Sequence, residues 1–131
     1  MTAYLLDTSV IIDFLTGRRD RAALLGSLLG QGHLLACCSV NVTEVYAGMR
    51  PPEGAKTDAF LQSLEYRKVS WEIARRAGLL KNEWARRGQT LSLADATIAA
   101  TALAGDLVLI TDNRKHFPMP ELKLYSLSSP A

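Results

Sequence analysis

The fold of this chain is decided by the stretch Tyr4-Leu5-Leu6-Asp7-Thr8-Ser9-Val10-Ile11-Ile12-Asp13-Phe14. Its apolar start, residues 4–6, predicts a short buried strand, and the apolar stripe from Val10 onward predicts a helix capped by Thr8 or Ser9. The carboxylate of Asp7 lies at the turn between them. In a parallel α/β sheet, the carboxyl ends of the strands form the edge where ligands bind. The question is therefore which other carboxylates meet Asp7 at that edge.

The composition is that of a globular protein. The chain has 131 residues, 48% of them hydrophobic and 21% charged. This is sufficient for one domain over residues 1–131 that buries a core without disulfides or structural metals. The net charge of +2 permits an anionic partner without requiring one.

Two features of the sequence favour a cytoplasmic location. Cys37 and Cys38 are adjacent, so in a strand they would point to opposite faces, and we expect no disulfide between them. Two buried free cysteines are typical of a reducing compartment. The N-terminus has no basic region, and Asp7 and Asp13 interrupt its apolar run, so we expect neither a signal peptide nor a membrane span.

Strands and helices alternate along the rest of the chain. Apolar runs predict strands at 34–40, 68–70, 107–111 and 122–126, and helical patterns predict helices at 22–29, 41–49, 53–64, 71–87 and 92–104. The helix at 71–87 has the clearest apolar stripe, and Gly105 is expected to cap the helix at 92–104. This alternation predicts an α/β fold, a mostly parallel central sheet of four to five strands covered by helices on both faces.

Four acidic residues occupy positions that such a sheet would bring together. Asp7 and Asp112 each follow a predicted strand, and Glu44 and Asp95 each lie in the first turn of a predicted helix. Each also has a structural explanation, because acids favour helix N-termini and turns. Two segments match the capping-box pattern, namely Asn41-Val42-Thr43-Glu44 and Ser92-Leu93-Ala94-Asp95.

Asp95 is the hardest of the four to explain as a cap alone. Ile98, Ala99 and Ala102 follow it at helical spacing, so Asp95 leads the apolar stripe of its helix. A carboxylate that points inward needs a cation, hydrogen-bond donors or a metal ion. A cluster of carboxylates without His or Cys favours Mg²⁺ or Mn²⁺. Such a site suits phosphodiester hydrolysis, in which the ion activates water and neutralises charge on the phosphate.

Four segments together resemble the PIN-domain ribonucleases of the VapC toxin type. They are Leu5–Ser9, Asn41–Glu44, Leu91–Ala96 and Leu109–Phe117. The resemblance covers nearly the whole chain, and it implies a PIN-like fold whose acids meet in one cleft. It also implies a Mg²⁺- or Mn²⁺-dependent endoribonuclease, the toxin of a toxin–antitoxin pair. Such a toxin would be a cytoplasmic homodimer, inhibited by a small VapB-type antitoxin.

The resemblance also assigns roles to the acids. Asp7, Glu44 and Asp95 correspond to the catalytic acids of the family, with Asp7 and Asp95 at the metal. The fourth acid falls on Asp112, which we expect to act as an outer ligand, with Asn113 as the alternative for this position.

Hydroxyl and basic side chains complete the expected site. Thr8 or Ser9, and Thr111, resemble hydroxyls that family members place beside the acids. A further set of residues could contact RNA phosphates, although a solvated surface is the simpler explanation for each of them. This set comprises Arg18, Arg19, Arg21, Arg86, Arg87, Arg114, Lys115 and His116.

Two other classes of function stay open. One is a PIN-like domain that binds its antitoxin or RNA without cleaving it. The other is a different acidic α/β module, such as a response-regulator receiver or an aspartyl-phosphatase. The phosphatases need Asp-x-Asp after the first strand, where this chain has Asp7-Thr8-Ser9, and receivers need acids before the last Asp of that strand. Both fit poorly.

Overall fold

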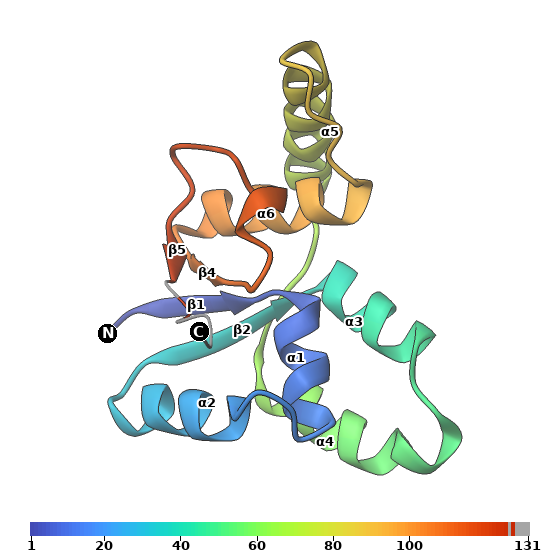
Figure 1. Cartoon of the computed structure of the whole chain (residues 1–131), viewed down its shortest axis with the longest axis vertical. Coiled ribbons are helices and arrows are strands. Elements are labelled where there is room, and N and C mark those ends of the chain that lie inside the picture. The colour runs from blue at the N-terminus through green and yellow to red at the C-terminus, as the bar shows by residue number, and fades with distance from the viewer. Residues whose placement is uncertain (126, 128–131) are drawn as a thin grey trace.

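A five-stranded sheet forms the centre of the computed structural model, which describes residues 1–125 and 127 (Figure 1). The strand order is β3-β2-β1-β4-β5, and all four pairings are parallel. The strands are β1 (Ala3–Leu6), β2 (Leu34–Cys38), β3 (Glu65–Arg67), β4 (Val108–Ile110) and β5 (Leu124–Tyr125). The predicted parallel α/β fold is confirmed.

Helices cover both faces of this sheet. Figure 1 shows α5 and α6 on one side of it and α1, α2 and α4 on the other. The helices are α1 (Thr8–Leu15), α2 (Arg21–Gly30), α3 (Ser39–Ala47), α4 (Gly54–Ser63), α5 (Trp71–Arg86) and α6 (Leu93–Gly105). Two short 3₁₀ turns lie at Pro51–Glu53 and Arg114–His116. No helix in the described part of the chain is long and apolar enough to cross a membrane.

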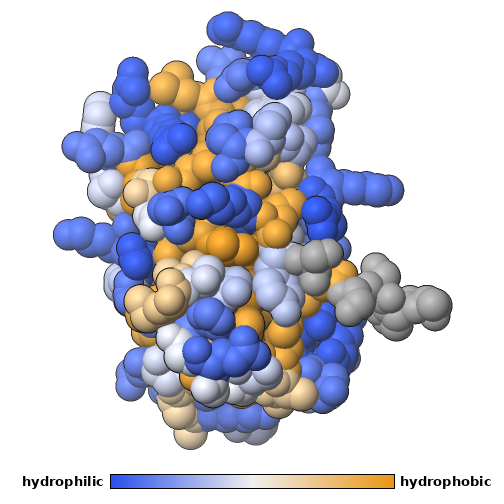
Figure 2. Space-filling model, turned by 90° about the vertical axis from the view of Figure 1, so that its left-hand side faces the viewer, coloured by the Kyte–Doolittle hydropathy of each residue, from blue (hydrophilic) through white to orange (hydrophobic). Residues whose placement is uncertain are grey.

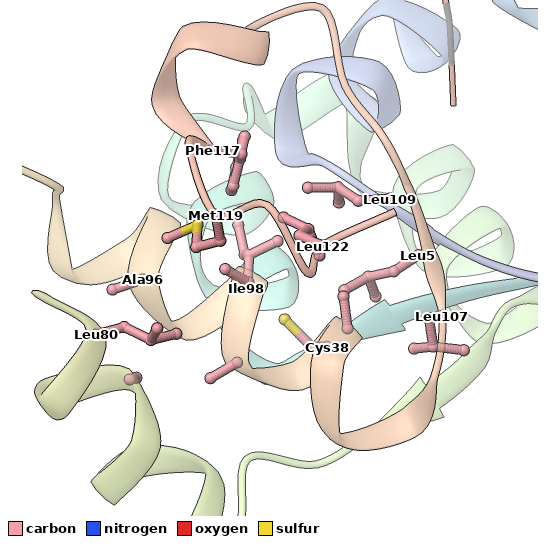
Figure 3. Packing of buried hydrophobic residues seen from close by; sticks show 14 of the residues in the cluster. Leu5, Cys38, Leu80, Ala96, Ile98, Leu107, Leu109, Phe117, Met119 and Leu122 are labelled. Atoms are coloured by element: carbon pink, nitrogen blue, oxygen red, sulfur yellow. The ribbon is translucent and has the colours of Figure 1, made fainter. Parts of the chain in front are cut away.

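The sheet separates two hydrophobic cores. Leu5 and Leu109 face the first core, where they meet Ile98 of α6, Leu80 of α5 and Phe117 (Figure 3). The next residue along β1, Leu6, faces the second core on the opposite side. Each fully buried side chain of this size contributes about 1.5–3 kcal/mol relative to an exposed one. The two cores therefore fix the position of β1, the strand that carries Asp7 at its end.

The two cysteines lie on opposite faces of β2, as predicted. Cys38 belongs to the first core and Cys37 to the second, and both are free thiols. Burial raises the pKa of Cys37 to about 11 and also raises the pKa of Cys38. Both thiols therefore stay protonated, and both side chains serve as small core residues.

The third strand is not where the sequence predicted it. β3 covers Glu65–Arg67, and the predicted strand at 68–70 is wrong, because Ser70 is the N-cap of α5 and accepts a hydrogen bond from the N–H of Ile73. β3 pairs only with β2 at the edge of the sheet. An edge strand can carry polar side chains. Because β3 is mostly polar, it lacks the apolar run by which a strand is recognised in the sequence.

Several element boundaries also differ from the sequence prediction, three of them in ways that have a local explanation or affect a predicted cap. β2 ends at Cys38, and α3 begins at Ser39 where the strand was expected to continue to residue 40. Gly105 is the last residue of α6 and not its cap. Asp106 follows in the left-handed conformation with φ of 51°, a conformation that short polar residues tolerate best after Gly. The final predicted strand, 122–126, is observed only as β5, and its last residue lies outside the described part of the chain.

An apolar surface lies away from the predicted acids. Figure 2 shows the side of the molecule where the N-terminus lies, and apolar residues gather along the middle of that face. A cavity of about 680 Å³ is lined by side chains from α1, α2 and α4, including Phe14, Leu25 and Phe60. None of the four predicted acids lines this cavity, so its size does not mark the site of chemistry.

Candidate active site

Asp7 lies at the point where β1 ends and α1 begins (Figure 1). Its N–H donates to the carbonyl of Ile110 at 2.9 Å, which joins the end of β1 to the end of β4. Asp7 is itself the N-cap of α1, because its carboxylate accepts a hydrogen bond from the N–H of Thr8. The prediction that Thr8 or Ser9 caps this helix is therefore wrong.

The carboxylate of Asp7 is buried among neutral hydrogen-bond donors. Its Oδ1 accepts from the N–H of Thr8 at 2.8 Å. Its Oδ2 accepts from the hydroxyls of Thr111 at 2.6 Å and Ser9 at 3.4 Å. The side chains that the resemblance placed beside the acids are thus in contact with Asp7. Only 5% of this residue is exposed, so these donors replace the water that its carboxylate has lost.

The electrostatics of Asp7 show which acids share its surroundings. Burial raises the pKa of Asp7 above its usual value, and the hydrogen bonds from Thr111 and Thr8 lower it in part. The negative charges of Asp95 and Glu44 raise this pKa further. Two of the other predicted acids therefore act on Asp7, although Asp7 follows β1, Glu44 lies in α3 and Asp95 lies in α6. A cation among them would relieve both the burial and the repulsion.

Glu44 reaches this group from the second turn of α3. The predicted capping box at Asn41–Glu44 is wrong, because α3 begins two residues earlier and Asn41 occupies the box position, where its Oδ1 accepts from the N–H of Cys38. The carboxylate of Glu44 is therefore not used to cap α3. Its Oε1 accepts a hydrogen bond of 2.7 Å from the hydroxyl of Thr8, the residue next to Asp7.

Asp95 lies in the first turn of α6, as predicted. The N-cap is Ser92, whose hydroxyl accepts from the N–H of Asp95 at 3.0 Å. The carboxylate of Asp95 lies 3.3 Å from Nδ1 of His116 and is 21% exposed. Its partner is therefore an exposed histidine from the turn after β4. Nothing in the sequence pattern pairs these two residues, because the contact depends on how the 111–117 segment folds over the N-terminus of α6.

Asp112 has different partners from the other three acids. It directly follows Thr111, but its carboxylate is held by Nη2 of Arg21 and lies 3.5 Å from Nη1 of Arg19. The side chains of Asp112 and Arg21 are only 14% and 10% exposed. Arg21 was predicted as a candidate RNA contact, and its burial in this ion pair contradicts that role. Asn113 contributes its backbone N–H, which donates to the hydroxyl of Thr111 at 2.9 Å.

This ion pair also fixes the loop between α1 and α2. Arg19 and Asp20 both have positive φ, 53° and 56°, a conformation that costs a residue other than Gly on the order of 1–3 kcal/mol. Arg19 bridges Asp13 and Asp112, and Arg21 anchors the loop to the turn after β4. The surrounding ion pairs offset the strain.

The donor chemistry of the site suits a hard divalent cation. Asp7, Glu44 and Asp95 offer only oxygen atoms, which Mg²⁺ and Mn²⁺ prefer. Within residues 1–125 and 127, no three His, Cys, Asp or Glu side chains are arranged to hold a metal by themselves. Mg²⁺ commonly takes only one or two protein carboxylates and completes its shell with water and substrate phosphate. A site of two acids with a third nearby therefore fits this ion.

Comparison with known proteins defines the family. The PIN domain model matches residues 4–120. Ribonuclease VapC19 of Mycobacterium tuberculosis is 35% identical over 120 residues, which cover 91% of this chain and 96% of the relative. Ribonuclease VapC10 of the same organism is 37% identical over 117 residues, 89% of this chain and 87% of the relative. The chain belongs to the PIN domain family and, within it, to the VapC type.

A solved structure confirms the fold. The VapBC2 complex of Rickettsia felis, bound to a DNA fragment from its promoter, contains a chain that superimposes with a TM-score of 0.83 at 25% identity. The match covers 95% of this chain and 98% of that chain. The PIN-like arrangement predicted from the four segments is therefore observed over nearly the whole molecule.

Replacing Asp7 with Asn tests the electrostatics of the site. The pKa of Asp7 is raised in the folded protein, so protonation of Asp7 stabilises the fold. This stabilisation is fully present below the pKa of Asp7 in the unfolded chain. It is lost as the pH rises through the pKa of Asp7 in the folded protein. The amide introduced by Asp7→Asn would stay neutral throughout. We expect metal-free Asp7→Asn to melt at a higher temperature than the wild type at neutral pH. The difference should vanish below about pH 4, near the ordinary pKa of Asp, and a lower melting temperature at neutral pH would contradict the account.

Replacing Arg21 with Met tests the ion pair with Asp112. Removal of one partner from a mostly buried pair leaves an uncompensated charge, which costs about 3–5 kcal/mol. The matched change Arg19→Met, at a side chain that is 59% exposed, should cost at most about 1 kcal/mol. Urea unfolding would measure both. Adding Asp112→Asn to Arg21→Met should recover part of the loss, and equal small losses in the two single variants would count against a buried pair.

Proposed function

We propose that this protein is a metal-dependent endoribonuclease that acts as the toxin of a type II toxin–antitoxin pair. The observation that carries the proposal is the buried Asp7 carboxylate, which neutral donors hold beside Glu44 and Asp95. A group of carboxylates of this kind suits a divalent ion and a phosphate substrate. The similarity to proteins named ribonucleases supports the reaction class.

In this proposal Asp7 and Asp95 would hold Mg²⁺, with Mn²⁺ as a substitute. The bound ion would activate a water molecule for in-line attack and neutralise the charge that develops on the scissile phosphate. Asp7 keeps its orientation through the N–H of Thr8, which binds Oδ1, and the hydroxyl of Thr111, which binds Oδ2. Glu44 is exposed, and its carboxylate would offer an acceptor to the water that attacks the phosphate.

Asp112 is the outermost acid of the proposed set. Arg21 and Arg19 bind its carboxylate, so its contribution to an ion would pass through water or require these partners to release it. Its loss should therefore lower cleavage less than the loss of Asp7, and lower stability more. Asn113 stays the alternative to Asp112 for this position, and its backbone N–H donates to the hydroxyl of Thr111.

The proposed partners follow from the family. Several similar solved structures are named as toxin–antitoxin complexes, including VapBC2 of Rickettsia felis and a complex from Klebsiella pneumoniae. For this chain we propose a VapB-type antitoxin that inhibits the site, a homodimeric toxin, and a cytoplasmic RNA substrate. The alternative is a PIN domain that binds antitoxin or RNA without cleavage, and the two experiments below distinguish these possibilities.

Cleavage of RNA by the purified protein is the first test. We expect Mg²⁺ or Mn²⁺ to support cleavage of structured RNA and EDTA to abolish it. Asp7→Asn and Asp95→Asn should each lower the rate by at least about 10²-fold, the usual cost of losing an electrostatic group at a reacting centre. The matched control is Asp106→Asn, since Asp106 lies just after the far end of α6 with a side chain that is 83% exposed. Undiminished cleavage by Asp7→Asn would exclude the proposed mechanism.

Calorimetric titration of Mn²⁺ separates an enzyme from a binding module without any RNA. We expect a Mn²⁺ site in the wild type that is lost in Asp95→Asn and kept in Asp112→Asn, because Arg21 already neutralises Asp112. An unchanged site in Asp95→Asn, or none in the wild type, would favour the domain that binds without cleaving.

A further inference from the structure

Asn41 is completely buried, and its hydrogen bonds define the direction of its side-chain amide. Its exposed fraction is 0%, which is rare for Asn. Oδ1 accepts from the N–H of Cys38 at 2.8 Å. Because a backbone N–H can only donate, this bond identifies the oxygen end of the amide. Nδ2 must then face the hydroxyl of Thr8, which lies 3.0 Å away.

The direction of this amide fixes the direction of the next hydrogen bond. Thr8 Oγ1 accepts a hydrogen bond from Asn41 Nδ2, so the hydroxyl of Thr8 can donate its own hydrogen bond to another acceptor. That acceptor is Oε1 of Glu44, at 2.7 Å. The three bonds run in one direction, from the N–H of Cys38 through Asn41 and Thr8 to Glu44.

We propose that Asn41 is a positioning residue, which acts through the hydroxyl of Thr8 to hold the Glu44 carboxylate beside Asp7 and Asp95. The consequence for catalysis rests on the proposed ribonuclease function, but the hydrogen-bond relay itself does not. A second relay of the same kind reaches Asp7, where the N–H of Asn113 donates to Thr111 and Thr111 donates to Asp7. In each case an N–H group occupies a threonine oxygen and directs its hydroxyl proton onto a carboxylate.

The capping role of Asn41 does not account for this arrangement. Capping α3 needs only an acceptor for the N–H of Cys38, which Asp would supply equally well. The Nδ2 group takes no part in that bond. Asn41→Asp therefore keeps the cap and loses the donor. The new carboxylate oxygen would accept a hydrogen bond from the hydroxyl of Thr8 and so turn that hydroxyl away from Glu44.

The first measurement is the rate of RNA cleavage. We expect Asn41→Ala, Asn41→Asp and Thr8→Val each to lower kcat by about 10–100-fold, the usual effect of losing a partner that orients a ligand, with a much smaller change in KM. Two matched controls should retain wild-type kcat. They are Asn82→Ala on the exposed face of α5, and Thr43→Val, whose hydroxyl bonds to the carbonyl of Ser39.

A double-mutant comparison shows whether Asn41 acts through Glu44. In a Glu44→Gln background, Asn41→Ala should cause little further loss of kcat, because residues that act as a unit are not additive. A full and independent loss in the double variant would overturn the proposal. The melting temperatures of the single variants identify any that fail to fold, and Thr8→Val provides the second test if Asn41 variants do.

A measurement without metal or RNA keeps this inference separate from the proposed function. The carboxyl ¹³C resonance of Glu44 in metal-free protein should shift in Asn41→Asp and Thr8→Val and stay unchanged in Thr43→Val. If the wild type cleaves no RNA but this resonance shifts, the proposed function is wrong and the relay stands. If the resonance is unchanged in both variants, the relay is wrong, whatever the activity of the wild type.

Discussion

The structure of the site depends on one unfavourable arrangement, a carboxylate that is buried at the end of a strand beside two others. Asp7 cannot leave this position, because its backbone completes the pairing of β1 with β4 and its side chain caps α1. Burial and the charges of Asp95 and Glu44 both raise its pKa. The fold thus holds Asp7 where burial and neighbouring negative charge both disfavour its ionised form, and a cation bound among these acids would offset both effects.

Two threonine hydroxyls hold the carboxylates in this arrangement through hydrogen bonds. Thr111 binds Asp7 and Thr8 binds Glu44, and each threonine oxygen is itself occupied by an N–H donor. A hydroxyl with a free oxygen could rotate and donate elsewhere, whereas these two have their protons directed by their neighbours. The carboxylates are therefore oriented by uncharged groups, which leaves their negative charge available to a cation.

The sequence predicted what depends on local pattern. Apolar runs identified β1 and β4. The position of Asp7 after a strand and those of Glu44 and Asp95 near predicted helix starts identified Asp7 and the two acids whose charges raise its pKa. What depends on contacts distant in sequence was missed. Arg21 lies 91 residues before Asp112, its partner, and no spacing rule connects them. The polar strand β3 and the capping of α3 by Asn41 were missed for a similar reason, since pairing and burial decided them rather than local hydrophobicity.

The central claim is that Asp7 and Asp95, with Glu44 nearby, form a site for Mg²⁺ or Mn²⁺. The most direct measurement is a crystal structure of the wild-type protein grown with Mn²⁺ and recorded at a wavelength where manganese scatters anomalously. The account predicts an anomalous peak between the carboxylates of Asp7 and Asp95, at Mn–O distances of about 2.0–2.3 Å, close to those of Mg²⁺. A peak elsewhere, or no peak at saturating Mn²⁺, would contradict it.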